Sequence, residues 1–257
     1  MAKSSPVSWN VLETFTFTDG PDVDRTVWQS PQWAPNNNPA FFGRTAIRNP
    51  TDNGAQGYTP VVGGAAQLYL STYNPLAPGQ SFFGSQISTI EQWGLANNPN
   101  GVAFEAVVLF PSGIPGGAVT SLFSYNLLSS SPFLHDEIDF EFASNWWSGA
   151  NEAVNTNVYV DSNNGIDQVV NSTVNLLQTT TFRIEWTPAG INWYINGGSS
   201  IRTETQVPQS NMSLTLNFWV PDTSWSWAYN SALQPSGSPG TQWVYQVTSA
   251  TVYGASG

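Results

Sequence analysis

One stretch of the chain, residues 135–142, reads HDEIDFEF and concentrates charge in a sequence that has little of it. Only 9% of the 257 residues are charged, yet four of the 17 acidic residues lie between Asp136 and Glu141. The only histidine, His135, stands immediately before them. The residues between the acids are an isoleucine and a phenylalanine, which favour strands. The stretch therefore predicts a strand that carries an unusual number of carboxylates.

Alternation along this strand sorts its side chains onto two faces, because successive side chains point to opposite sides. Glu137, Asp139 and Glu141 share one face. The other face is mostly apolar and carries Asp136, Ile138, Phe140 and Phe142. We expect the apolar face to pack into a core. Like charges side by side on the other face repel each other, a cost that proteins usually accept for a metal or for chemistry.

The rest of the chain also favours strands. Segments rich in Val, Ile, Thr, Phe and Tyr recur between Gly, Pro and Asn residues, and helical periodicity is nearly absent. The expected strands span residues 13–17, 66–72, 81–90, 102–110, 119–125, 137–142, 153–160, 168–174, 181–187, 191–196, 212–220 and 243–253. This spacing predicts an all-β fold, a sandwich of two antiparallel sheets. We find no linker or internal repeat, so residues 1–257 are expected to form a single domain.

Turn residues mark the connections. The segment INWYINGGSSIRTE, residues 191–204, predicts a hairpin that turns at Asn196, Gly197 and Gly198. Two stretches rich in Pro, Asn and Gly, residues 30–64 and 221–241, are expected to form loops.

Composition excludes several classes of partner. The formal net charge is -11, and the six basic residues are scattered along the chain. Nucleic acids and anionic membranes need clustered Lys and Arg, so we expect neither as a partner. The chain has no cysteine and no run of eighteen apolar residues, so it forms no disulfide and no helix that spans a bilayer. Its first nine residues, MAKSSPVSW, lack the apolar core of a signal peptide, which leaves an intracellular protein and a protein with a removed leader both open.

Three hypotheses compete for the acidic strand. A solvated edge strand would carry interspersed basic residues, but none lies between Arg48 and Arg183. A calcium site would suit clustered carboxylates, yet alternate residues on one strand spread over roughly 13 Å, too far for one ion. The third hypothesis is catalysis on a glycosidic bond by paired carboxylates.

Catalysis assigns a task to each acid. A retaining glycosidase needs an ionised nucleophile and a protonated acid whose carboxyl groups lie about 5–5.5 Å apart. Glu137 and Glu141 would have to lean toward each other, because their Cα atoms are about 13 Å apart on an ideal strand. Asp139 stands between them and can share a proton with one glutamate.

The acidic stretch resembles the Glu-x-Asp-x-Glu signature of glycoside hydrolase family 16. Residues 102–125, 156–159, 181–197 and 212–219 are similar to segments of that family in the same order. The resemblance implies a jelly-roll, concanavalin A-like sandwich with a concave carbohydrate-binding cleft. It also implies that Glu137 is the nucleophile, Glu141 the acid/base and Asp139 an assisting carboxylate.

Details of the motif resemble two branches of the family. No residue is inserted before the last glutamate, as in bacterial lichenases and plant xyloglucan transglycosylases. A histidine at position 135 is similar to the plant enzymes, whereas lichenases usually have Trp there. Lichenases also usually carry an acidic and a basic residue near the positions of Gln86 and Ser88. Thr248 stands where the family usually has an aspartate that often ligates calcium. We therefore expect no cofactor and no metal-binding residue, and a structural calcium ion stays the alternative.

Further residues are candidates for contact with sugar. The resemblance and the strand faces point to His135, Phe123, Asn157, Tyr159, Asn217, Trp219, Gln86 and Trp225. His135 could instead modulate Glu137 or take a surface position at the strand start, and Tyr159 could pack within the sheet. For Asn217 and Trp219, a polar Asn beside an exposed Trp favours a cleft over a core. Trp186 is expected in the core.

Three functions follow from the resemblance. The first is a retaining endo-β-glucanase, licheninase-like, that hydrolyses mixed-linkage β-1,3-1,4-glucan or β-1,4-glucan. The second is a transglycosylase of the xyloglucan type, and the third is a non-catalytic carbohydrate-binding jelly-roll protein. We expect a secreted or extracellular monomer with a polysaccharide, a β-glucan, as its substrate.

Overall fold

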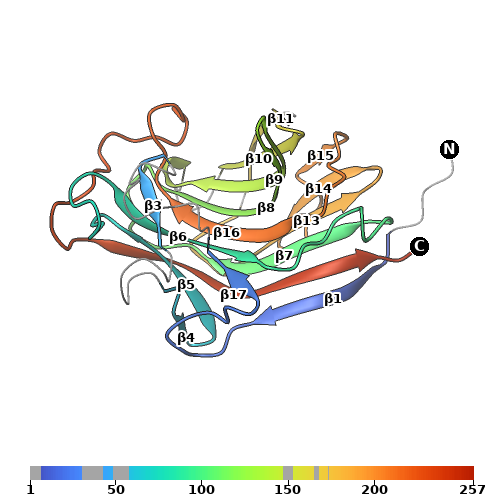
Figure 1. The fold of residues 1–257 in the computed structure, drawn as a ribbon, viewed down its shortest axis with the longest axis horizontal. Helices are drawn as coiled ribbons and strands as arrows, with labels where there is room; N and C mark the ends of the chain where they lie inside the picture. The colour runs from blue at the N-terminus through green and yellow to red at the C-terminus, as the bar shows by residue number, and fades with distance from the viewer. Residues whose placement is uncertain (1–6, 31–42, 49–57, 147–152, 165–167, 173) are drawn as a thin grey trace.

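Two layers of β-strands make up the protein (Figure 1). The computed structural model describes residues 7–30, 43–48, 58–146, 153–164, 168–172 and 174–257. In the described part no helix is long and apolar enough to cross a membrane.

The strands and a single 3₁₀ turn follow one another along the described ranges of the chain. They are β1 (Trp9–Thr16), β2 (Trp28–Gln29), β3 (Thr45–Ile47), β4 (Val61–Val62), β5 (Ala65–Ser71), β6 (Phe82–Thr89), β7 (Val102–Leu109), β8 (Val119–Ser130), β9 (Phe133–Ala143), the 3₁₀ turn η1 (Ser144–Trp146), β10 (Ala153–Val160), β11 (Asn163–Asn164), β12 (Gln168–Asn171), β13 (Thr180–Thr187), β14 (Gly190–Ile195), β15 (Arg202–Glu204), β16 (Ser213–Trp219) and β17 (Gln242–Ala255).

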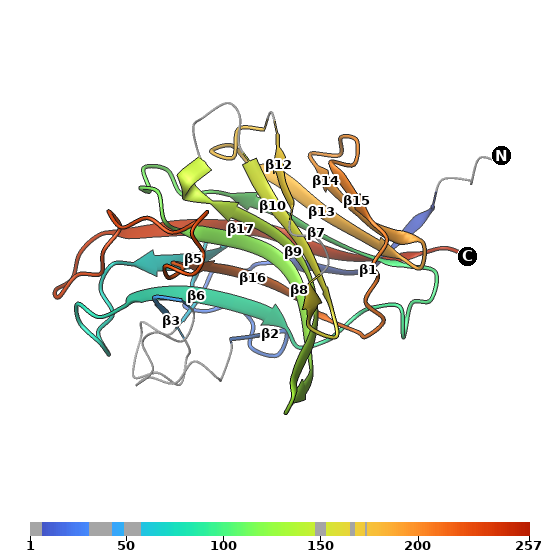
Figure 2. The ribbon, with the colours of Figure 1, turned by 90° about the horizontal axis from the view of Figure 1, so that it is seen from above.

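The strands form a front sheet and a back sheet (Figure 2). The front sheet has the order β2-β6-β16-β8-β9-β10-β12, with β11 also on β10. In the back sheet β17 pairs with β7 on one side, and β13, β14 and β15 continue from β7. The other side of β17 pairs with β5 in its first half and with β1 in its second. The acidic strand β9 therefore lies inside the front sheet, between β8 and β10.

Strict alternation explains why the back sheet buries one face. In β13, TTFRIEWT, buried and half-buried residues alternate without exception. Phe182, Ile184 and Trp186 lie in the core, whereas Arg183 and Glu185 point outward and form an ion pair at 2.9 Å. A one-residue slip would expose every apolar side chain of the strand, so the pattern determines the register.

The inner face of β9 packs against this layer. Ile138, Phe140 and Phe142 are all fully buried. The ring of Phe182, from the back sheet, lies 4.4 Å from that of Phe142 and 5.2 Å from that of Phe140. Burial of each such side chain contributes about 1.5–3 kcal/mol. This packing sets the orientation of β9 and turns Glu137 and its two acidic neighbours to the opposite face.

The two-sheet sandwich, the hairpin at residues 196–198 and the core position of Trp186 are confirmed. The turn has a left-handed Asn196, at φ 51°, followed by Gly197 at φ 67°. Residues 221–241 contain no helix or strand, as expected.

Some expectations were wrong. β8 and β9 extend to Ser130 and Phe133 and form a longer hairpin than expected. Residues 30–64 are not loop throughout, since β3 and β4 lie there, and β3 is parallel to β6 rather than antiparallel. Two or three residues cannot display an alternating pattern, so the sequence does not indicate these strands. Residues 31–42 and 49–57 of the same expected loop lie outside the described part.

Candidate active site

The carboxylates of β9 lie on the outer face of the front sheet, opposite the core. A strand with partners on both sides cannot be a solvated edge strand, so that hypothesis is wrong. The side chain of Glu137 is 21% exposed, while Asp139 and Glu141 are 4% and 8% exposed. Burying these like-charged groups together costs free energy unless they find partners.

A pocket of about 270 Å³ opens above the three acids. Its lining combines β9, β10 and the loop after β16: Glu137, Asp139, Glu141, Asn155, Asn157, Tyr159, Ser224, Trp225 and Trp227. Segments that lie far apart in the sequence thus meet around the carboxylates. Acids, amides and aromatic rings in one hollow are the groups that a polar ring-shaped ligand needs.

Strand β10 places one polar side chain beside each acid. Its register sets Tyr159 opposite Glu137, Asn157 opposite Asp139 and Asn155 opposite Glu141. The Asn155 amide nitrogen donates a hydrogen bond to Glu141 Oε2 at 2.9 Å. Asn155 therefore holds the Glu141 carboxyl group in place.

Two tyrosines beside the acids have raised pKa values. Burial raises the pKa of Tyr159, and the charges of Asp139, Glu137 and Glu141 raise it further. Burial and the Glu137 charge raise the pKa of Tyr125, on the neighbouring strand β8, to about 12. Both phenols keep their protons at neutral pH and are available there as hydrogen-bond donors.

His135 lies two residues before Glu137 on the same face of β9. Its Nε2 is 3.2 Å from Glu137 Oε2, and its Nδ1 is 2.9 Å from the Ser162 hydroxyl. The expectation that His135 lies on the side of Glu137 is confirmed, and its contact is with that carboxylate.

The floor beside the acids comes from β8, β16 and β6. Phe123, on β8, lies opposite Asp139. Across the neighbouring strands, Ser121 lies opposite Glu141, Asn217 opposite Ser121 and Gln86 opposite Asn217. Among the described residues, Gln86 Oε1 and Asn217 Oδ1 have no hydrogen-bond partner. Buried acceptors of this kind are usually satisfied by water or ligand. Both residues lie on the acidic face but outside the pocket lining.

Tryptophans of the loop after β16 wall the pocket. The rings of Trp225 and Trp227 lie 5.5 Å apart, and Trp146 stacks on Trp227 at 5.0 Å. Trp225 lines the pocket with the acids, and its contact with sugar stays a prediction. The expectation of an exposed Trp219 was wrong, because its ring is 5% exposed and packs edge-on against Trp225 at 5.1 Å. The loop covers it, which the strand sequence alone does not indicate.

Sequence reasoning missed Asn155, Ser162 and Ser224. Alternation in AVNTNVYV, residues 153–160, could have found Asn155, because it shares a face with Asn157 and Tyr159. Ser162 and Ser224 reach the site through turns, and no local pattern indicates them.

Asp136 has a separate, structural task. It points to the inner face, is 3% exposed, and accepts hydrogen bonds from the Ser210 hydroxyl at 2.7 Å and the Asp161 amide at 3.0 Å. The fourth acid of the motif thus ties loops to β9 and does not face the pocket.

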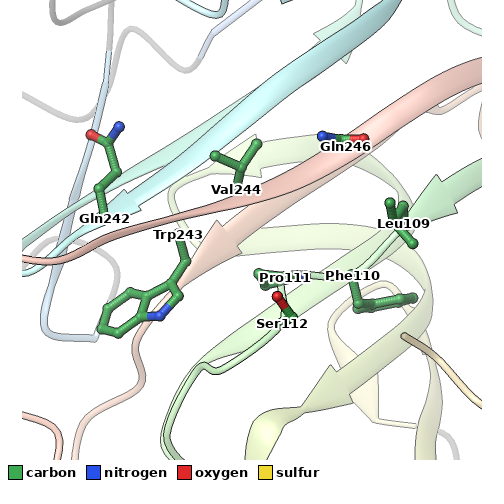
Figure 3. Close-up of a pocket in the computed structure, with 8 residues that line it drawn as sticks. All are labelled: Leu109, Phe110, Pro111, Ser112, Gln242, Trp243, Val244 and Gln246. Carbon is green, nitrogen blue, oxygen red and sulfur yellow. The ribbon is translucent and has the colours of Figure 1, made fainter. Parts of the chain in front are cut away.

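Within the described ranges no three His, Asp or Glu side chains are grouped to hold a metal ion. A second hollow, of about 290 Å³, lies where β7 ends beside β17 (Figure 3). Its lining is Leu109, Phe110, Pro111, Ser112, Gln242, Trp243, Val244 and Gln246. That lining contains no acid or base, so the carboxylates point to the pocket on the front sheet as the place for proton transfer.

Comparison with known proteins gives one family. The model of the family described as Glycosyl hydrolases family 16 matches residues 106–244, which is more than half of the chain. The match begins in β7, ends in β17 and includes all three acids of β9.

Individual relatives are more distant. A beta-glucanase of Bacillus licheniformis is 28% identical over 132 residues, 50% of this chain and 51% of that protein. A beta-glucanase of Paenibacillus polymyxa is 28% identical over 119 residues, 45% of this chain and 48% of that protein. The chain thus spans about half the length of the curated relatives it matches. The solved structure of the Bacillus licheniformis beta-glucanase matches with a TM-score of 0.66 and 19% identity, covering 98% of this chain and 99% of that chain, which is a likeness in fold.

Proposed function

Because the chain belongs to the glycosyl hydrolases family 16, we propose that it is a retaining endo-β-glucanase acting on mixed-linkage β-1,3-1,4-glucan or β-1,4-linked glucan. The observation that carries the proposal is the position of Glu137 and Glu141, which share one face of β9 and line one pocket. Two carboxyl groups at one hollow are the minimal apparatus for cleaving a glycosidic bond.

The reaction proceeds in two displacements. A Glu137 oxygen attacks the anomeric carbon while the bond from that carbon to the leaving oxygen breaks, and Glu141 gives its proton to the leaving oxygen. A water molecule then attacks the same carbon, loses a proton to Glu141 and releases Glu137. The two inversions restore the original anomeric configuration.

The contacts of the glutamates support this division of roles. The carboxylate of Glu137 lies 3.2 Å from the imidazole of His135, a contact that can hold the attacking group in place. Glu141 is held through Oε2 by Asn155, which fixes the group that must meet the leaving oxygen. Asp139 lies between them and lines the same pocket.

A neutral polymer fits the charge of the protein. The net charge of -11 and the three acids at the pocket repel sulfated or acidic polysaccharides. The amides of Asn155 and Asn157 and the rings of Trp225 and Trp227 suit the hydroxyl groups and apolar faces of a glucan. Beta-glucanase is also the name of both relatives matched in sequence.

The test is the release of reducing ends from mixed-linkage glucan, xyloglucan, laminarin and agarose, by the wild-type protein and by Glu137→Ala. We expect activity on mixed-linkage glucan that the variant loses. Silence of the wild-type protein on the whole panel contradicts the proposal, and binding without cleavage would make it a carbohydrate-binding protein.

Transglycosylation is the second candidate, because His135 precedes the acidic motif as in the plant transglycosylases. It predicts that a labelled xyloglucan oligosaccharide is incorporated into polymer while few reducing ends appear. We also propose that the protein acts as a monomer outside the cell, since its substrate is a polymer. Sedimentation of the purified protein and activity in the culture medium of the source organism test these two points.

A further inference from the structure

The only histidine of the chain contacts the proposed nucleophile. His135 Nε2 lies 3.2 Å from Glu137 Oε2, and the two side chains are 12% and 21% exposed. The sequence left three roles open for His135: a contact with sugar, a modulator of Glu137, or a surface position at the strand start. A ring nitrogen directed at the Glu137 carboxylate fits the second of these roles, and the contacts around the ring show what form it takes.

A turn holds the other side of the imidazole. Ser162 Oγ lies 2.9 Å from His135 Nδ1 and accepts the His135 backbone N–H at 2.8 Å. The Ser162 amide donates to the His135 carbonyl at 2.7 Å. Ser162 therefore contacts His135 through three separate hydrogen bonds.

The turn itself is a strained one. Asp161 and Ser162 adopt the left-handed region, at φ 51° and 63°, which costs free energy for residues other than glycine. The Asp161 amide is held by the buried carboxylate of Asp136 at 3.0 Å. Asp136 therefore holds the turn, and the turn holds the neighbouring His135.

Aromatic rings restrict the tilt of the imidazole. The Tyr125 ring, on β8, stacks on the imidazole with ring centroids 5.5 Å apart. The Tyr159 ring, on β10, has its centroid 4.8 Å from that of the imidazole. Phe133 lies at 5.2 Å. With neighbours from β8, β9 and β10, the imidazole has little freedom to turn away from Glu137.

The proton arrangement is consistent in both charge states of the ring. A neutral imidazole has one donor, and the Ser162 hydroxyl can donate to Nδ1, which leaves the proton on Nε2 facing Glu137. In the imidazolium both nitrogens donate, and the Ser162 hydroxyl can then turn to the Phe133 carbonyl at 3.3 Å. In either state Nε2 donates to Glu137 Oε2.

We propose that His135 is a positioning residue that orients the Glu137 carboxylate for attack on the anomeric carbon. The proposal rests on the proposed function. The imidazole holds Oε2 through its N–H and so directs the second oxygen, Oε1, into the pocket. Ser162 acts behind it by selecting the orientation and the donor nitrogen of the ring.

The experiment compares three variants with the wild-type protein. His135→Phe keeps a ring between the tyrosines and removes the donor, whereas His135→Gln keeps an N–H at a similar reach. Ser162→Gly removes the hydroxyl and suits the left-handed backbone. The substrates are the dinitrophenyl β-glycosides of cellobiose and laminaribiose, whose leaving group needs no proton. The parameter is kcat/KM, which reports the step in which Glu137 attacks.

We expect His135→Phe to lower kcat/KM by about tenfold to a hundredfold, the range for a hydrogen bond to a charged group. His135→Gln should regain much of this loss, and Ser162→Gly should lose several-fold. Calorimetry with a mixed-linkage tetrasaccharide, in a Glu141→Gln background, should give a Kd that His135→Phe leaves within about twofold.

Several results would overturn the inference. A Kd weakened by the same factor as kcat/KM would make His135 a sugar contact. A loss seen on the polymer but not on the dinitrophenyl glycosides would place the defect in proton donation. Unchanged kinetics in His135→Phe would leave the contact without a role. If the wild-type protein cleaves neither the glycosides nor the polymers, the proposed function fails and the inference fails with it. If the wild-type protein is active and the variants keep its kcat/KM, only the inference is contradicted.

Discussion

Replacing Trp193 with phenylalanine should weaken the tie between the back sheet and the acidic strand. Trp193, on β14, is fully buried and its Nε1 donates to the Asp139 carbonyl at 2.8 Å, across the core. The variant loses this donor and leaves a buried carbonyl short of a partner, which costs about 1–3 kcal/mol. The smaller ring leaves a void of roughly 40 Å³, worth about 1 kcal/mol more.

The sum, about 2–4 kcal/mol, should lower the melting temperature by roughly 5–15 °C for a domain of this size. Differential scanning calorimetry measures it. Trp186→Phe is a matched control, because Trp186 is equally buried and its Nε1 donates to the Pro208 carbonyl at 3.1 Å, away from the acids. Both variants should be destabilised, but at 25 °C only Trp193→Phe should also lose turnover, because β9 moves. A shift of less than about 2 °C, or equal turnover in both variants, would refute the reasoning.

Three further predictions concern the pocket and the loop beside it. Asn155→Ala removes the 2.9 Å bond to Glu141 Oε2 and should lower kcat/KM about tenfold; unchanged steady-state kinetics would contradict this. Trp227→Ala removes a stacked pocket wall and should raise KM about threefold to tenfold with little change in kcat; a KM within error of wild type would speak against stacking. Hydrogen bonds from Ser224 lower the pKa of Asp222 below its usual value of 3.8. The ionised carboxylate therefore stabilises the folded protein above pH 3.8, and this stability is lost as the pH falls through the lowered pKa. The free energy of unfolding, measured from pH 6 to 2.5, should fall less steeply in Asp222→Asn than in the wild-type protein, and the same slope in both would contradict this.

The strands and the acids could be predicted because both depend on local periodicity. In β9 and β13 one apolar residue in two determines the buried face, and this leaves Glu137, Asp139 and Glu141 outside. The cluster of like charges then stands out without any knowledge of partner strands. The structural task of Asp136 could not be predicted, because its hydrogen-bond partners come from other loops.

The remaining features depend on contacts distant in sequence. The pairing of β10 with β9 decides that Asn155 meets Glu141, and a left-handed turn brings Ser162 to His135. The strand around Trp219 predicts a cleft residue, yet a loop that follows it folds back and covers the ring. Short strands such as β3 form because β6 offers an edge for pairing, not because of a pattern of their own.

The most direct measurement is the configuration of the first product, followed by proton NMR while mixed-linkage glucan is hydrolysed. Two displacements at the pocket of Glu137 and Glu141 predict that the β-anomer appears first and the α-anomer grows later by mutarotation. Initial release of the α-anomer would contradict the assignment of Glu137 as a nucleophile.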